Sequence, residues 1–262
     1  MRKNFDIIQG NPRQCLFAMV LPMMAAMFLN MAYNLVDSLW IGNLLGESAY
    51  AALTAATPIL LLLNSIAMGA TNGVAILLSQ AIGAGETRRT RTILFTSFIL
   101  SIVFSLGMTG LLEGMVSPLL RFLQVPSELY EMTCLYLRIY LIGYGAVYLY
   151  CYFAAVLRSF GDTVFQMLAM LVCTVLNGAL DPLLIHGFGL QGAAEATVLS
   201  QGICLGFMVC YLRKKALFSF HAADWSGKEL GAVCLKSLPA AFQQSIPAIS
   251  TSVLTAKSAV LG

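Results

Sequence analysis

Residues 48–85 contain no charged side chain and are mostly apolar. A run of about 20 apolar residues is enough for an α-helix to cross the hydrocarbon core of a bilayer. The imbalance extends along the chain, because 59% of its 262 residues are hydrophobic and only 10% are charged, against roughly 25% charged in soluble domains. So few charges cannot cover a soluble surface, and the sequence therefore predicts an all-α integral membrane protein.

Seven apolar segments are long enough to be membrane helices. The second contains Pro58, Gly69 and Gly73, which predict a bent or tilted helix. The seventh is still running at Gly262. The segments lie at about 15–41, 50–80, 92–112, 133–157, 164–185, 193–212 and from 230 onward. This count predicts a six-helix lobe at 1–214, a loop at 215–229 and an incomplete seventh helix at 230–262.

Basic residues gather in every second connection. The N-terminus and three connections hold most of them: Arg2, Lys3 and Arg13; Arg88, Arg89 and Arg91; Arg158; Arg213, Lys214, Lys215 and Lys228. The alternate connections hold Glu47, then Arg121 with Glu128 and Glu131, then His186. By the positive-inside rule, the N-terminus and the basic connections are cytoplasmic. A wrong helix count would scramble this alternation, so the pattern supports six complete spans.

Two carboxylates inside predicted spans are the sharpest chemical features. A charged residue at the centre of a membrane helix costs at least about 2.5–3.5 kcal/mol on insertion scales. Asp37 and Asp181 both lie late in outward-running helices, and Tyr33 and Asn177 stand four residues before them, on the same helix faces. The alternatives are acids that are merely hydrogen-bonded or interfacial. Their matching depth favours one shared proton or cation site.

Other polar residues allow two interpretations each. Glu195 could join that site or lie at the interface, and Arg138 could reach lipid headgroups or pair with an acid. Lys257 lies inside the seventh segment. Four tyrosines of the fourth span could line a cavity or pack in the core: Tyr136, Tyr140, Tyr144 and Tyr148. The seven cysteines form no CxxC pair and are interpreted as apolar filler, and no enzyme motif is present.

Five segments in order resemble the MATE family, the multidrug and toxic compound extrusion antiporters, and most closely its bacterial DinF-like branch. The match covers essentially the whole chain. A faint repeat, in which Leu21-Pro22 and Leu238-Pro239 both stand early in an apolar helix, agrees with two-fold duplication. The matching segments are Tyr33-Asn-Leu-Val-Asp37-Ser-Leu-Trp-Ile-Gly42, Gln80-Ala-Ile-Gly-Ala-Gly85, Leu157-Arg-Ser-Phe-Gly-Asp162-Thr, Asn177-Gly-Ala-Leu-Asp181-Pro-Leu-Leu-Ile and Gly192-Ala-Ala-Glu-Ala-Thr-Val-Leu-Ser-Gln201.

The resemblance implies two six-helix lobes around a central cleft, with this chain as the first lobe. It implies export of drugs or other amphipathic or cationic small molecules across the bacterial inner membrane, driven by inward H+ or Na+. It implies no cofactor, no catalytic residue and no nucleic-acid partner. The residues that it implies for binding H+ or Na+ are Asp37, Asp181, Asn177, Tyr33, Thr197 and Tyr136, and the implied hinge is Pro22.

The sequence departs from the family pattern in two residues and in length. Ala154 stands where many relatives have an asparagine, and Glu195 stands where they usually have an uncharged residue. Relatives have about twelve helices, so we expect a truncated first half, completed by a second lobe or by a second copy of the chain. The alternatives are a lipid-linked oligosaccharide flippase of the same superfamily and a non-functional transporter fragment.

Overall fold

The computed structural model describes residues 12–215 and 225–261, with side chains described to Thr251. Arg2, Lys3 and the side chain of Lys257 lie outside these residues. Every regular element in the described part is a helix: α1 (Pro12–Leu45), α2 (Glu47–Gly83), α3 (Thr87–Phe122), α4 (Ser127–Ser159), α5 (Thr163–Phe188), α6 (Leu190–Lys214) and α7 (Gly227–Leu261). The first six are long and apolar enough to cross a membrane. The predicted class, a six-helix membrane lobe followed by the start of a seventh helix, is confirmed.

The helices extend beyond the apolar segments that predicted them. The third segment, expected at 92–112, belongs to a helix that runs from Thr87 to Phe122. The extra turns carry polar residues such as Arg89 and Glu113. A helix satisfies its own backbone hydrogen bonds, so it can continue through the headgroup region past the hydrocarbon core. Hydropathy therefore located the spans but underestimated their length.

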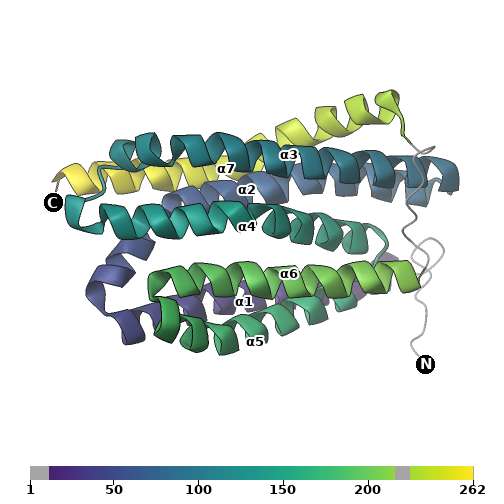
Figure 1. Ribbon diagram of the computed structural model, residues 1–262. Coiled ribbons are helices and arrows are strands. Elements are labelled where there is room, and N and C mark those ends of the chain that lie inside the picture. The colour runs from purple at the N-terminus through teal and green to yellow at the C-terminus, as the bar shows by residue number, and fades with distance from the viewer. Residues whose placement is uncertain (1–11, 216–224, 262) are drawn as a thin grey trace.

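The helices run side by side along one axis in two layers. One layer contains α1, α5 and α6, and the other contains α2, α3, α4 and α7 (Figure 1). Contacts of α4 with α6, and of α1 with α2, join the layers. The start of α1, the α2–α3 and α4–α5 turns and the end of α6 share one end of the bundle (Figure 1). We call it the basic end, because the predicted basic connections lie there.

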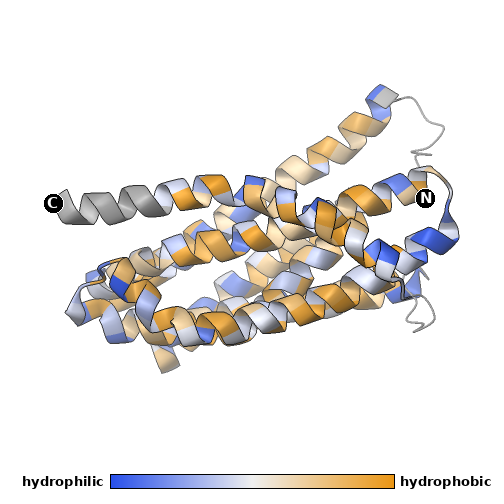
Figure 2. Ribbon diagram, turned by 90° about the horizontal axis from the view of Figure 1, so that it is seen from above, coloured by the Kyte–Doolittle hydropathy of each residue, from blue (hydrophilic) through white to orange (hydrophobic). Residues whose placement is uncertain are grey.

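Hydrophobic residues dominate the length of the helices, and hydrophilic residues gather at the ends of the bundle (Figure 2). On α1, Leu16, Phe17, Leu21 and Phe28 are all more than half exposed. Such a surface is stable only in a solvent as apolar as itself, which a lipid bilayer supplies. The exposed apolar face and the six spans together describe a multi-pass membrane protein.

The four tyrosines of α4 that the sequence singled out, Tyr136, Tyr140, Tyr144 and Tyr148, pack in the core and do not line the cavity described below. All four are nearly fully buried. Tyr144 donates a hydrogen bond of 3.0 Å to the Leu63 carbonyl, and Tyr140 accepts one of 3.2 Å from Asn64. Buried hydroxyls need such partners. The packing interpretation of this stripe is the one that the structure bears out.

The turn between α4 and α5 uses the glycine and the aspartate of the Arg-Ser-Phe-Gly-Asp segment. Gly161 has a φ of 75°, which favours glycine, and the Asp162 carboxylate accepts a hydrogen bond of 3.3 Å from the Phe165 amide, capping α5. Lys215 donates to the same carboxylate at 2.7 Å, and Tyr211 also donates to it. Partial burial raises the pKa of Asp162, but these hydrogen bonds outweigh burial and leave it below its usual value. The hydrogen bond to Asp162 raises the pKa of Lys215.

Helix α7 packs against α2 through two glycines one turn apart. A Cβ atom on Gly69 would lie 2.5 Å from Cα of Ala241, and one on Gly73 would lie 2.5 Å from Cα of Ser237. Small residues at this spacing let membrane helices approach closely. The Ser237 hydroxyl donates a 2.8 Å hydrogen bond to the Ala70 carbonyl.

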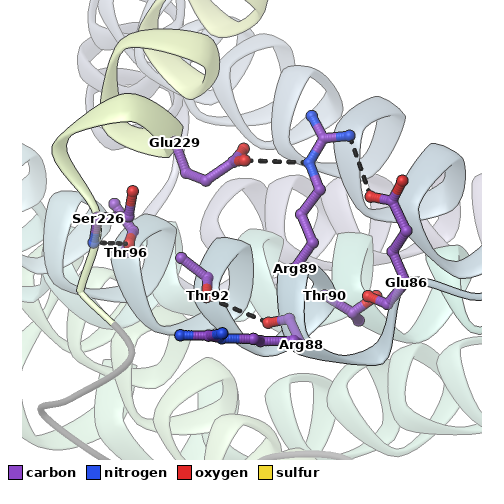
Figure 3. A network of polar contacts seen from close by, with 8 residues as sticks. All are labelled: Glu86, Arg88, Arg89, Thr90, Thr92, Thr96, Ser226 and Glu229. Carbon is purple, nitrogen blue, oxygen red and sulfur yellow. Dashed lines mark hydrogen bonds and ion pairs between the residues drawn. The ribbon is translucent and has the colours of Figure 1, made fainter.

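A polar network secures the start of α7 against α3. Arg89 contacts Glu229 of α7 at 3.0 Å and Glu86 at 3.3 Å (Figure 3). The Ser226 amide donates to the Thr96 hydroxyl at 3.3 Å (Figure 3). The seventh helix is therefore attached to the six-helix bundle at its basic end as well as along the glycine seam.

Replacing Gly73 by leucine should separate α7 from α2. The added side chain meets backbone atoms, which cannot move aside as a flexible side chain can, so we expect a loss of about 1–3 kcal/mol. Thermal unfolding of the purified protein, followed with a thiol-reactive dye, measures the effect. The matched control is Gly110→Leu, because a Cβ atom at Gly110 meets nothing within 4 Å. Equal melting temperatures for the two variants would contradict the seam.

The Asp162 contacts predict a pH-dependent stability. Because the folded-state pKa of Asp162 is lowered, its contribution is complete above the unfolded value of about 4 and disappears as pH falls through the folded value. We expect wild type to be more stable than Asp162→Asn by about 1 kcal/mol at pH 6, with the difference vanishing as the pH falls below the lowered pKa of Asp162. Melting temperatures of both proteins across this range test the sign. A gap that persists at low pH would show that charge is not its cause.

Candidate functional site

The two predicted carboxylates meet between α1 and α5, in the half of the bundle away from the basic end. Asp181 is fully buried and Asp37 is 8% exposed. They are close enough to interact electrostatically. Asn177 donates a hydrogen bond of 3.0 Å from Nδ2 to Oδ1 of Asp181, as expected for residues one turn apart. The fold therefore brings Asp37, Asp181 and Asn177 into one cluster, which we call the acid cluster.

The three remaining predicted residues surround this cluster. Tyr33 is buried beside Thr197 and Ser200 of α6. Tyr136 of α4 is buried and interacts electrostatically with both carboxylates. Residues from α1, α4, α5 and α6 thus converge at one depth, because each helix contributes from the part nearest the same end of the bundle.

Several buried oxygen atoms of the cluster have no hydrogen-bond partner within the described part of the chain. They are Oδ1 of Asp37, Oδ2 of Asp181 and Oδ1 of Asn177. The ion pairs found among the described residues include neither aspartate. A buried carboxylate without a basic partner is very costly as an anion. A proton or a small cation would neutralise it, and oxygen ligands suit either.

A cavity of about 330 Å³ lies between α1, α2, α4 and α5, toward the basic end from the acid cluster. Sulfur-containing side chains form much of its wall: Met23, Met27, Met31, Met68, Cys151 and Met170. Ala154, at the position where relatives carry an asparagine, also lines it. The sequence reasoning missed this cavity, although Met23, Met27 and Met31 recur every fourth residue and so share one face of α1.

The polar lining of the cavity includes an arginine that the sequence had placed in a connection. Arg158 lies in the last turn of α4 and donates from Nη2 to Oδ1 of Asn72 on α2 at 2.7 Å. Gln166 of α5 lines the same cavity, and its Oε1 is buried without a partner in the described residues. With Asn30 of α1, the polar groups of the cavity therefore come from four helices.

The cavity and the acid cluster touch the same side chains. Met170 lines the cavity and also packs against Tyr33, together with Cys173 and Cys204. The Tyr150 hydroxyl, which lines the cavity too, donates to the Met170 sulfur at 3.2 Å. A change at the carboxylates can therefore reach the cavity through the Tyr33–Met170 contact and through α1 itself.

The remaining predicted residues have simpler surroundings. Pro22 lies inside α1, which is helical on both sides of it, so a bend at this position stays a prediction. Arg138 pairs with Glu113 of α3 at 3.9 Å, which is the acid-pairing interpretation. Glu195 is half-buried near the start of α6. Within the described residues, no group of three or more His, Cys, Asp or Glu side chains could hold a metal ion.

A bundle of membrane helices that encloses buried acids beside a cavity is the architecture of a membrane transporter. The chain matches the MatE family over residues 22–183, which is more than half of its length. It therefore belongs to the MATE family of membrane transporters, as the five segments predicted.

Similar proteins agree with this assignment. The chain is 32% identical over 247 residues to a probable multidrug resistance protein of Bacillus subtilis, covering 93% of this chain and 56% of that protein. It is 27% identical over 240 residues to the FAD transporter of Shewanella oneidensis, covering 86% and 53%. The outward-facing structure of a multidrug resistance MATE family transporter matches with a TM-score of 0.86 at 28% identity, covering 93% and 55%. The chain thus spans about half the length of these relatives.

The hydrogen bond from Asn177 to Asp181 should be coupled energetically to the carboxylate. We expect Asn177→Ala to lower stability by about 1–3 kcal/mol, because it removes a partner from a buried acid, and to cost less when Asp181 is already alanine. A double-mutant cycle on thermal stability measures this coupling. Asn34→Ala is the control, since Asn34 is exposed and donates only within its own helix. Additive losses would show that the pair is not coupled.

Proposed function

We propose that the chain is the first lobe of a cation-coupled antiporter that exports drugs or other amphipathic small molecules. The observation that carries this proposal is the pair of buried carboxylates, Asp37 and Asp181, that have no basic partner in the described residues and lie beside a cavity in a transporter fold. Inward-moving H+ or Na+ is the ion that would neutralise them. In a membrane, ionisable residues persist mainly where they line a pathway or bind an ion.

Coupling follows from the sharing of α1 between the two sites. One face of α1 carries Asp37 of the acid cluster and Tyr33 beside it. Its earlier turns supply Met23, Met27 and Met31 to the cavity. A proton or Na+ at the carboxylates favours one position of α1, and a substrate in the cavity favours another. Pro22 leaves a backbone carbonyl of α1 without its usual donor, which weakens the helix at that turn and gives it a place to bend.

The basic end indicates how the helix bundle is oriented in the membrane. Arg88, Arg89, Arg91 and Arg213 lie at that end with the start of α1, so the positive-inside rule places it and the N-terminus in the cytoplasm. The acid cluster then lies in the outer half of the bacterial inner membrane, where it can receive a cation from outside. The cavity lies closer to the cytoplasm, where it can receive the substrate.

A second lobe completes the transport path in this proposal. Met27, Met31 and Met68 line the cavity yet remain 43–69% exposed, so one side of the cavity is open. Either a second lobe or a second copy of the chain would close it. Proteins similar to this chain bear names for different cargoes, multidrug export and FAD transport, so the cargo has to be argued from the cavity itself.

Replacing Asp37 by asparagine should abolish cation-coupled efflux. A side-chain amide does not ionise near neutral pH, and it binds Na+ more weakly than a carboxylate does. The measurement is dye efflux from cells that lack their own pumps, for this chain alone and for the chain completed with a second lobe. We expect at least about a tenfold loss of efflux with unchanged protein levels. Glu131→Gln, an exposed acid near the same end, is the control.

The outcomes of this experiment separate three readings. Efflux by the chain alone that depends on Asp37 supports assembly from two copies. Efflux only by the completed version identifies the chain as one lobe of the antiporter. Undiminished efflux in Asp37→Asn would contradict ion coupling at this cluster.

A further inference from the structure

The cavity carries a positive charge that no carboxylate of the described residues neutralises. Arg158 is the only charged residue among the described residues that line it. No aspartate or glutamate of the described residues lines it. Arg158 takes part in none of the ion pairs of the described residues. Its side chain donates a hydrogen bond to the neutral Asn72. A guanidinium has five N–H donors and suits planar, bidentate recognition of carboxylates and related anions.

A second polar group of the same cavity is also available to a ligand. The Gln166 side chain lines the cavity, and its amide oxygen is buried without a partner in the described residues. Ala154 lines the cavity without adding a polar group. The lining thus includes the Arg158–Asn72 pair and the Gln166 amide as groups that can bind a polar ligand.

The rest of the lining suits an aromatic ring. Methionine side chains are flexible and polarizable, make favourable contacts with aromatic rings and adapt to varied shapes. Five methionines and Cys151 line the cavity. Its volume of about 330 Å³ lies within the range of small-molecule sites, roughly 300–1,000 Å³.

From this arrangement we infer that the cavity binds amphipathic aromatic anions, with a carboxylate or sulfonate at Arg158 and the ring among the methionines, rather than organic cations. The inference deepens the proposed transport function and rests on it. It assigns opposite charges to the two sites: the cation to the acid cluster, and the anionic substrate to the cavity.

The separation of charge has a consequence for the driving force. With the basic end in the cytoplasm, outward movement of an anion and inward movement of a cation both carry positive charge inward. The inside-negative membrane potential therefore favours both movements. An organic cation exported on the same path would instead move against this potential.

Two dyes with one scaffold and opposite charge test the inference. Fluorescein is an anionic xanthene, and rhodamine 123 is a cationic xanthene of similar size. The 262-residue chain, in nanodiscs of neutral phosphatidylcholine, is titrated against each dye and followed by fluorescence anisotropy. No ion gradient is present, so ion coupling can fail in the efflux assay without affecting this result.

We expect fluorescein to bind about tenfold more tightly than rhodamine 123. Arg158→Gln should weaken fluorescein binding by about tenfold and leave rhodamine 123 binding unchanged or tighter. Arg158→Lys, which keeps the charge, should restore most of the fluorescein affinity. The control is Arg91→Gln, because Arg91 is exposed and does not line the cavity.

Three results would overturn the inference. The first is rhodamine 123 binding as tightly as fluorescein, and the second is binding of neither dye. The third is an equal loss of both dyes in Arg158→Gln with a lowered melting temperature and no rescue by lysine, which would assign Arg158 only to holding α4 against α2.

Discussion

The hydrocarbon core of a bilayer offers no hydrogen-bond partners, and the rest of this structure depends on that constraint. Every backbone N–H and C=O group at this depth must be satisfied within the chain, which long helices do by themselves. Apolar side chains can then face outward, as Leu16 and Phe28 do. A polar side chain is stable only where other helices enclose it, so enclosed groups without partners identify the sites of interest.

By that criterion, α1 is the central element of the lobe. Its apolar outer residues face lipid, its buried Asp37 belongs to the acid cluster, and its partly exposed methionines form one wall of the cavity. Its packing against α5 brings Asp37 to Asp181 and Tyr33 to Met170. A proline in its first half weakens the helix that contributes residues to both sites. Under the proposed function, a movement of this helix would couple the two sites directly.

Helix α7 is attached differently from the others. It packs along α2 at a glycine seam and is secured at the basic end by the Arg89–Glu229 ion pair. Close backbone packing of this kind leaves little room for a side chain, so this contact is specific in position. Helix α7 thus has a defined position on the six-helix bundle.

The sequence by itself determined the all-α membrane class, the six spans and the identity of the paired acids, because hydropathy and residue spacing along one helix are local properties. Only the tertiary structure showed that Tyr136 interacts with both acids and that Thr197 lies against Tyr33. It also showed that Tyr140, Tyr144 and Tyr148 pack in the core and that Arg158 lines a cavity. These facts depend on how the helices are rotated and paired, which no periodicity within one helix specifies. The methionine stripe of α1 was visible in the sequence, but its role required α2, α4 and α5 to enclose a space against it.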